Sequence, residues 1–178
     1  MSELFSCLKM IRIPILLLFC FLSVYCGYHL RGTGSSLPPH IRRVYIPTFK
    51  NLTARFELDV KLTQKVRDEI VARGKVELTG DEKSADAVLV GEITSFTATP
   101  IAFSGQATAD RYNITIATKI ILRDLVNRKI IFSNPFYVYQ QEYEVPEGTD
   151  FETVQTEAIE KVAERFARSL VITMLEGF

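Results

Sequence analysis

Cys26 is the residue best placed for covalent chemistry. It follows an apolar run over residues 13–25, and two cations, Lys9 and Arg12, precede that run. A basic segment followed by a short apolar segment is the layout of a bacterial export signal. The run has 13 residues, fewer than the roughly 20 that a membrane-spanning helix needs. The pattern therefore predicts cleavage before Cys26 and attachment of a diacylglycerol to its thiol.

Two other interpretations of this leader stay open: plain cleaved secretion and a retained N-terminal anchor. A lipid-attachment signal usually has a small residue before its cysteine, whereas this chain has Tyr25. Cys20 fits the pattern less well, because Phe19 precedes it and apolar residues follow it. A buried, unmodified thiol is a further interpretation, but the position of Cys26 between an apolar leader and a polar chain disfavours it.

Side chains for catalysis or metal binding are scarce in the rest of the sequence. The two histidines, His29 and His40, both lie close to the predicted anchor. No cluster has metal-ligand spacing, and the sequence has neither a glycine-rich phosphate loop nor a nucleophile elbow. We therefore expect a protein that is not an enzyme and that holds no cofactor or metal.

The net charge narrows the possible functions of the protein further. Residues 1–25 hold two of the 21 lysines and arginines and one of the 21 acidic residues, so the remaining chain has a net charge near −1. That balance argues against bulk electrostatic binding of nucleic acid. We predict three regions: a lipoprotein signal peptide at 1–25, the lipidated cysteine with a tether at 26–40, and a single domain at 41–178.

The first half of the domain alternates strands with a helix. Apolar residues recur every four positions from Leu58 to Ile70 and predict a helix over 56–73, with Gly74 as its stop. Short strands are expected at 43–49 and 75–79. A longer strand is expected from Ala87 to about Thr99, limited by Pro100 and followed by a surface loop at 101–110.

The second half predicts a long hairpin and a helix. Alternation from Arg111 to Arg123 indicates a strand with one apolar face, and residues 129–145 should return antiparallel to it. The turn at 124–128 contains Asn127, which is able to take a left-handed conformation, and Pro135 should mark a bulge or an edge position within the returning strand. Thr149 and Glu152 match a capping box that opens a helix to about Leu175.

These elements predict an α+β fold. Both helices and the hairpin have one apolar face, and helices packed on one side of a sheet would bury all of these faces. We therefore expect a two-layer sandwich, with two helices on one face of a mixed, mostly antiparallel sheet.

The stretch at the end of the leader also resembles a known family, LptE (also called RlpB), the lipopolysaccharide-assembly lipoproteins of Gram-negative outer membranes. In that family the lipidated cysteine is typically followed by Gly, an aromatic, His or Arg, Leu, Arg and Gly. The matching residues here are Cys26, Gly27, Tyr28, His29, Leu30, Arg31 and Gly32. The segments at 46–53 and 85–93 are similar to the family as well, so the resemblance covers most of the chain.

The resemblance implies a function and its partners. Members of the family plug the lumen of the LptD β-barrel, help it to assemble and contact lipopolysaccharide on its way to the outer leaflet. It thus implies an LptD-like partner, lipopolysaccharide as ligand, and a periplasmic-side location on the outer membrane through a lipid anchor with acyl chains such as palmitate. The alternative is an envelope lipoprotein of another machine, either a peptidoglycan-synthase activator or a secretion-channel component.

Three cations near the ends of the predicted hairpin are candidate contacts to lipopolysaccharide: Arg111, Arg128 and Lys129. Lipid A carries phosphates, and a guanidinium group can bind phosphate through two hydrogen bonds. Ordinary surface charge is the alternative explanation for each of the three.

Overall fold

The folded part of the chain is built on one mixed sheet. The computed structural model describes residues 37–103 and 109–176, which belong to one compact unit, Ser35–Phe178. The strand order is β3-β1-β4-β5-β6, and β2 pairs with β4 beside this path. The strands are β1 (Arg43–Tyr45), β2 (Lys50–Asn51), β3 (Glu77–Thr79), β4 (Ala87–Phe103), β5 (Ala109–Asp124) and β6 (Lys129–Glu144). Pairings among β1 to β4 are parallel, whereas β4–β5 and β5–β6 are antiparallel.

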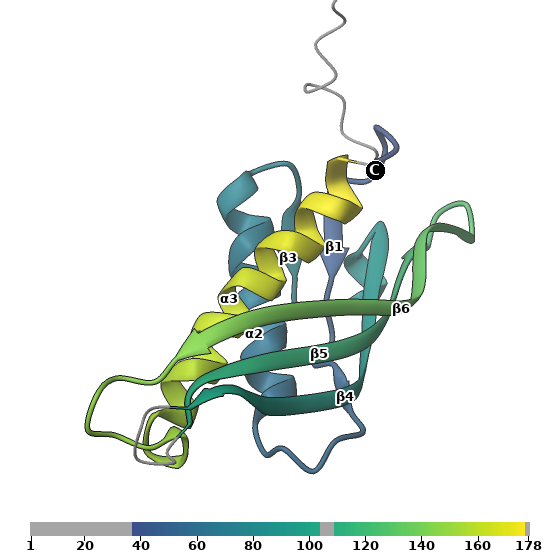
Figure 1. Ribbon diagram of the computed structural model, residues 1–178. Coiled ribbons are helices and arrows are strands. Elements are labelled where there is room, and N and C mark those ends of the chain that lie inside the picture. Colours follow the sequence, from purple (N-terminus) through teal and green to yellow (C-terminus); the bar gives the residue numbers. More distant parts are fainter. Residues whose placement is uncertain (1–36, 104–108, 177–178) are drawn as a thin grey trace, which may run out of the picture. The chain divides into compact units, whose positions relative to one another are not determined.

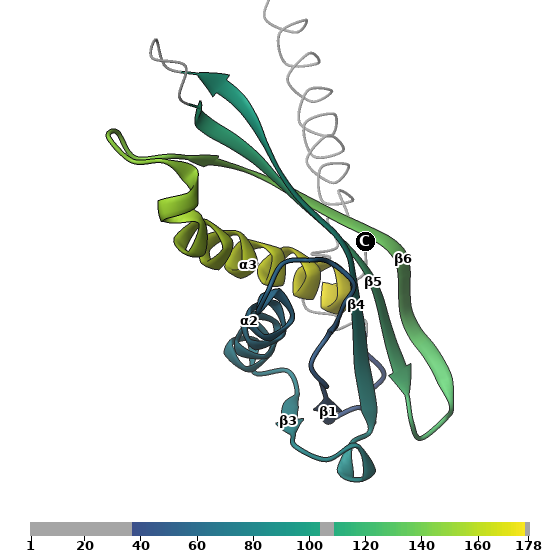
Figure 2. The same ribbon diagram turned by 90° about the horizontal axis from the view of Figure 1, so that it is seen from below.

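Two long helices, α2 (Leu58–Arg73) and α3 (Phe151–Glu176), lie on the same face of this sheet (Figures 1 and 2). A short 3-10 helix, η1 (Glu82–Ser84), precedes β4. The predicted α+β class and the placement of both helices on one face are therefore confirmed. The two helices also contact each other, because Lys65 of α2 pairs with Glu160 of α3 at 2.6 Å.

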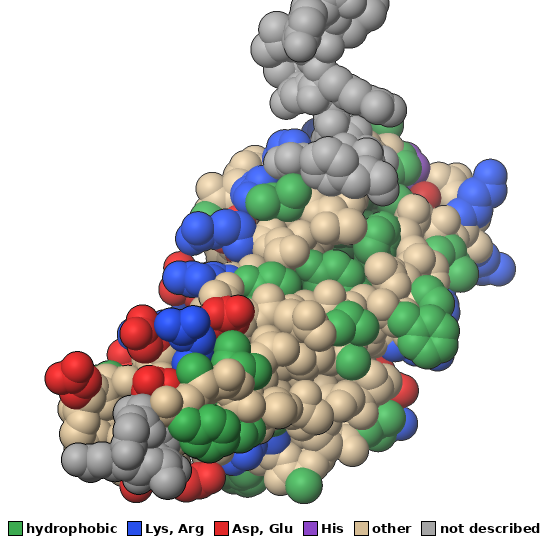
Figure 3. All heavy atoms as spheres, in the orientation of Figure 1, with side chains coloured by type: hydrophobic (Ala, Val, Ile, Leu, Met, Phe, Trp, Pro, Cys, Tyr) green, Lys and Arg blue, Asp and Glu red, His purple; other side chains and the backbone are tan. Residues whose placement is uncertain are grey.

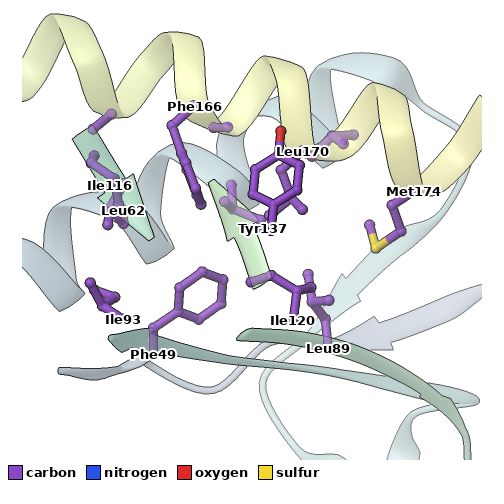
Figure 4. Packing of buried hydrophobic residues seen from close by; sticks show 14 of the residues in the cluster. Phe49, Leu62, Leu89, Ile93, Ile116, Ile120, Tyr137, Phe166, Leu170 and Met174 are labelled. Atoms are coloured by element: carbon purple, nitrogen blue, oxygen red, sulfur yellow. The ribbon is translucent and has the colours of Figure 1, made fainter. Parts of the chain in front are cut away.

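The apolar stripes of the helices form the core together with the inner face of the sheet. Leu58, Leu62, Val66 and Ile70 of α2 are all buried, as their four-residue spacing predicts. Figure 4 shows Phe166 pointing from α3 toward the sheet beside Tyr137. The two rings pack edge to face, with centroids 5.7 Å apart.

The predicted hairpin of β5 and β6 is confirmed along its whole length. Ile114, Ile116, Ile120 and Leu122 point inward and are at most 1% exposed. The register shifts between the pairs Thr118–Tyr137 and Ile120–Asn134, so β6 has extra residues around Pro135. This is the bulge expected at that proline, which has no N–H to give to the ladder.

Several predicted boundaries were wrong. The strand expected at 43–49 is two short strands on either side of Pro47, because proline cannot donate to the ladder. The helix expected from Phe56 begins at Leu58, after Glu57 takes a left-handed φ of 59°. The strand expected at 75–79 begins at Glu77. The end of α2 is as expected, since Gly74 has φ 61° and its N–H bonds to the carbonyl of Val71.

Pro100 does not limit β4, which continues to Phe103. The parallel partners β1 and β2 pair only with residues up to Ile93, so beyond that point β4 has one open edge within the described residues. Irregular register at Pro100 and Ala102 absorbs the proline. The loop predicted at 101–110 is therefore strand at both ends, and residues 104–108 lie outside the described part.

Two local features differ by one residue from what the sequence indicates. Arg128, not Asn127, takes the left-handed conformation in the β5–β6 turn, with φ 55°. The cap of α3 is Asp150, whose Oδ1 accepts the N–H of Thr153 at 2.8 Å, whereas Thr149 donates its hydroxyl to the carbonyl of Pro146. A side-chain acceptor directly before the first helical residue satisfies the N–H groups that the helix leaves free.

Gly91 allows the ring of Phe49 to lie directly on the sheet. A Cβ at Gly91 would stand 2.6 to 2.7 Å from three ring atoms of Phe49, which is too close for packed atoms. We predict that Gly91→Ala lowers the free energy of unfolding by about 1 to 3 kcal/mol, as overpacking of a core does. Urea unfolding would measure this. In a Phe49→Ala background the same substitution should cost much less, and an equal cost in both backgrounds would contradict the steric explanation.

Candidate functional site

The lipidation motif lies outside the described residues. Cys26 and the residues that follow it, Gly27, Tyr28, His29, Leu30, Arg31 and Gly32, precede Leu37, where the description begins. Their roles therefore stay predictions.

The three candidate cations lie at opposite ends of β5. Arg111 lies near its beginning and points its guanidinium toward Glu142 of β6, with 3.9 Å between nitrogen and oxygen. Arg128 and Lys129 lie at the turn that follows its end, 16 residues of extended chain away from where β5 begins. Both are exposed. The three cations therefore do not form one site. Arg111 has Glu142 beside it in an exposed pair, whereas Arg128 and Lys129 have no side-chain partner among the described residues.

A polar network, which we did not predict, holds this turn to the beginning of the domain. The Nε2 atom of His40 lies 2.8 Å from Oδ2 of Asp124 and 3.0 Å from Nδ2 of Asn127. Asp124 also accepts the backbone N–H groups of Val126 and Asn127, at 2.8 and 2.9 Å. Leu37 and Ile41, on either side of His40, are buried in the core. The segment at 37–41 is thus fixed against the β5–β6 turn.

These hydrogen bonds keep Asp124 ionised. Burial by itself would raise the pKa of this carboxyl, which is 2% exposed. The bonds from Asn127, His40 and Val126 outweigh burial and lower the pKa from 3.8 to about 2. The network therefore keeps Asp124 ionised in the folded chain down to about pH 2.

This pKa gives a pH dependence of stability. Because the folded pKa is below the unfolded one, Asp124 stabilises the fold fully above about pH 4, and this contribution is lost as pH falls from about 4 to about 2. We predict that the free energy of unfolding falls more steeply over this range in the parent chain than in Asp124→Asn. Urea unfolding at several pH values would measure both. Parallel curves would contradict the role of the carboxylate.

A groove lies next to this network, where α2 ends and β3 begins. Its volume is about 960 Å³, and it is lined by His40, Arg42, Arg43, Val71, Gly74, Lys75, Val76, Glu77, Leu78 and Asp86. Asp86 is already engaged, since it accepts the N–H groups of Arg42 and Arg43 at 3.0 and 2.8 Å. These bonds, that of Arg43 foremost, lower the pKa of the Asp86 carboxyl. We refer to this space as the His40 groove.

The sheet face opposite the helices is uncovered within the described residues, as Figure 2 shows. Several cross-strand rows on that face carry side chains that can form hydrogen bonds, and the charged residues Lys119 and Arg123 lie on the same face further along β5. Two such rows are Thr97–Thr115–Gln140 and Thr99–Asn113–Glu142. A third row, Ser95–Ala117–Val138, and the exposed Phe136 add apolar surface. The face therefore suits a broad protein contact through polar rows and a few apolar side chains.

The described residues offer little else for chemistry. Among residues 37–103 and 109–176, no group of three or more His, Cys, Asp or Glu side chains is placed to hold a metal ion. In the same ranges, no helix is both long and apolar enough to cross a bilayer.

Comparison with known families gives one match. The family model described as LptE, lipopolysaccharide-assembly, matches residues 41–174. This range contains nearly all of the described fold and begins after the cysteine motif. No curated protein matches the chain.

The chain is also similar to solved structures, at low sequence identity. A hypothetical protein of Chlamydia trachomatis, CT253, is 11% identical, with a TM-score of 0.53, over 78% of this chain and 97% of its own. A minor lipoprotein of Acinetobacter baumannii is 14% identical, with a TM-score of 0.47, over 77% of this chain and 92% of its own. At this identity the Chlamydia structure supports the fold alone.

Proposed function

The chain belongs to the LptE family of lipopolysaccharide-assembly proteins, and from this premise we propose that it is an outer-membrane lipoprotein that plugs an LptD-like β-barrel. In this proposal Cys26 is the lipidated residue, and the leader before it is a signal peptide. The domain stands on the periplasmic side of the membrane, helps the barrel to assemble and assists insertion of lipopolysaccharide into the outer leaflet. The observation that carries the proposal is the family match over residues 41–174.

The uncovered sheet face supports a contact with the lumen of a barrel. The interior of a large outer-membrane barrel is polar, so a plug must meet it with hydrogen-bonding groups. The rows Thr97–Thr115–Gln140 and Thr99–Asn113–Glu142 supply such groups on a continuous surface. Among the described residues this face has no cover of its own.

The β5–β6 turn supports a contact with lipopolysaccharide. Arg128 and Lys129 are exposed at its tip, and their neighbour Asp124 is occupied by His40 and Asn127. Figure 3 shows lysine and arginine side chains gathered at the projecting tip on the right of the view. We assign lipid A phosphates to Arg128 and Lys129, and we leave Arg111 out because Glu142 lies beside it at the other end of β5.

We predict that replacing Arg128 and Lys129 together by Glu weakens lipopolysaccharide binding about tenfold or more, since two attractive charges become repulsive. Binding of the barrel and the unfolding temperature should stay nearly the same, because the tip makes no core contact. Binding to immobilised lipopolysaccharide at low and at high salt would measure the effect, which should shrink as salt screens the charges.

The matched control is Arg165→Glu with Arg168→Glu, which changes the net charge equally on the exposed side of α3. If both double variants weaken binding alike, the effect is one of total charge and the tip is not the site. If the tip variant loses the barrel as well, the tip is a plug contact.

Affinity purification of the tagged chain from detergent-solubilised outer membrane tests the proposal as a whole. A large β-barrel should co-purify in a one-to-one complex. Recovery of a penicillin-binding protein or of a secretion channel instead would favour the alternative, an envelope lipoprotein of another machine.

A further inference from the structure

Exposed cations lie near the place where the chain enters the domain, and a segment with several acidic residues lies at the other end of β6. Leu37 and Ile41 are buried, and His40 is bonded to Asp124, so the chain enters the fold beside the β5–β6 turn and the His40 groove. The segment from 142 to 152, by contrast, holds five acidic residues and no lysine or arginine. Figure 1 shows the connection between β6 and α3 at the lower left, at the opposite end of β6 from the β5–β6 turn.

The His40 groove contains two cations with no side-chain partner among the described residues. Arg42 and Lys75 line it, and both are exposed. The carboxylate of Asp86 is already bound by two backbone N–H groups and by the Arg43 side chain. Glu77 is then the lining acid that offsets the positive charges of Arg42 and Lys75. A guanidinium and an ammonium group on one open groove are suited to a phosphate group.

The length of the tether limits the distance between the lipid anchor at Cys26 and the end of the domain that holds the His40 groove. Cys26 and Leu37 are eleven residues apart in the sequence. A chain of that length reaches at most about 40 Å and, when flexible, spans about 18 Å on average. The acidic segment lies beside the beginning of β5, whereas the β5–β6 turn follows the end of this strand, which has 16 residues and extends for about 50 Å. The groove is thus the part of the domain that an anchored chain keeps closest to the bilayer.

We propose that the His40 groove binds the phosphate of anionic phospholipid headgroups in the leaflet that holds the lipid anchor, with Arg42 and Lys75 as the contacting residues. The inference rests on the proposed lipidation of Cys26. Binding of this end, together with repulsion of the acidic end from the anionic surface, orients the domain with the acidic segment away from the membrane.

The test uses the full chain, processed in cells, purified and reconstituted into vesicles. These vesicles contain phosphatidylethanolamine and phosphatidylglycerol, a quencher on a fraction of the headgroups, and no lipopolysaccharide. A fluorophore is placed on Gly80→Cys, where a side chain meets no atom within 4 Å, or on Glu147→Cys in the acidic segment. After cleavage before Cys26, the engineered cysteine is the only free thiol.

We expect the label at position 80 to be quenched and the label at position 147 to be quenched little. In the Arg42→Glu, Lys75→Glu variant, quenching at position 80 should fall about threefold or more, as it should without phosphatidylglycerol or at high salt. The control variant Arg165→Glu, Arg168→Glu should behave as the parent. Thermal unfolding checks that each variant is folded, and the milder Arg42→Gln, Lys75→Gln should give an intermediate loss.

Equal quenching at both positions would overturn the inference, and so would equal losses in the two charge-reversed variants. Quenching that appears only after lipopolysaccharide is added would assign the groove to that ligand instead. A chain that does not float with the vesicles contradicts the lipid anchor and this inference with it. A chain that floats without orientation contradicts the inference alone.

Discussion

Replacing Phe166 by alanine should lower the free energy of unfolding by about 3 to 5 kcal/mol, the range for truncation of a buried aromatic side chain. Phe166 is fully buried, and its ring packs edge to face on both Tyr137 and Tyr139, with centroids 5.7 and 6.2 Å away. Its removal leaves a cavity between α3 and β6 and also removes these ring contacts. Urea unfolding followed by circular dichroism would measure the loss.

Phe136 is the matched control for this substitution. It lies on β6 one residue before Tyr137, but its side chain is 85% exposed on the uncovered face. Phe136→Ala should therefore change stability by less than about 0.5 kcal/mol, as exposed positions usually do. A loss below about 1 kcal/mol for Phe166→Ala, or similar losses for both residues, would show that the assignment of the inner and outer faces is wrong.

Replacing Cys26 by alanine should abolish lipid attachment and leave an uncleaved precursor or a soluble protein. The Cys26 sulfur is the atom that would carry the diacylglycerol, and no other residue of the motif has a thiol that can replace it. Each buried methylene of an acyl chain contributes about 0.8 kcal/mol to membrane residence, so loss of the chains releases the domain. Intact mass and membrane fractionation would measure both effects.

Cys20→Ala is the control, because this cysteine lies within the apolar run and is removed with the signal peptide in our proposal. It should leave acylation and localisation unchanged. An intact mass with an unmodified thiol at Cys26, or loss of acylation in Cys20→Ala, would contradict the assignment of the lipid to Cys26.

The sequence predicts best where periodicity is strong. The stripe from Leu58 to Ile70 and the alternation along β5 both depend on burial of one face, and the structure confirms both. Periodicity does not decide which of two neighbouring polar residues caps a helix or takes a left-handed conformation in a turn. Asp150 replaces Thr149 as the cap of α3, and Arg128 replaces Asn127 in the left-handed conformation, because hydrogen bonds to atoms a few residues away decide such positions.

The His40 network and groove could not be predicted from local patterns. His40 and Asp124 are 84 residues apart, and only the return of β5 to the beginning of the domain brings them together. The signals in the sequence were a single aspartate at a strand end and a single histidine in a proline-containing tether. The separation of Arg111 from Arg128 and Lys129 also follows from the length of β5.

The most direct test of the account is cross-linking from the uncovered sheet face in living cells. A photoreactive amino acid at Val138 would stand on that face, and one at Lys161 on the exposed side of α3 would serve for comparison. If the domain plugs a barrel through this face, Val138 should cross-link to one large outer-membrane β-barrel protein, and depletion of the chain should lower lipopolysaccharide at the cell surface. Cross-links from Val138 to a peptidoglycan synthase, or none to any β-barrel, would contradict the account.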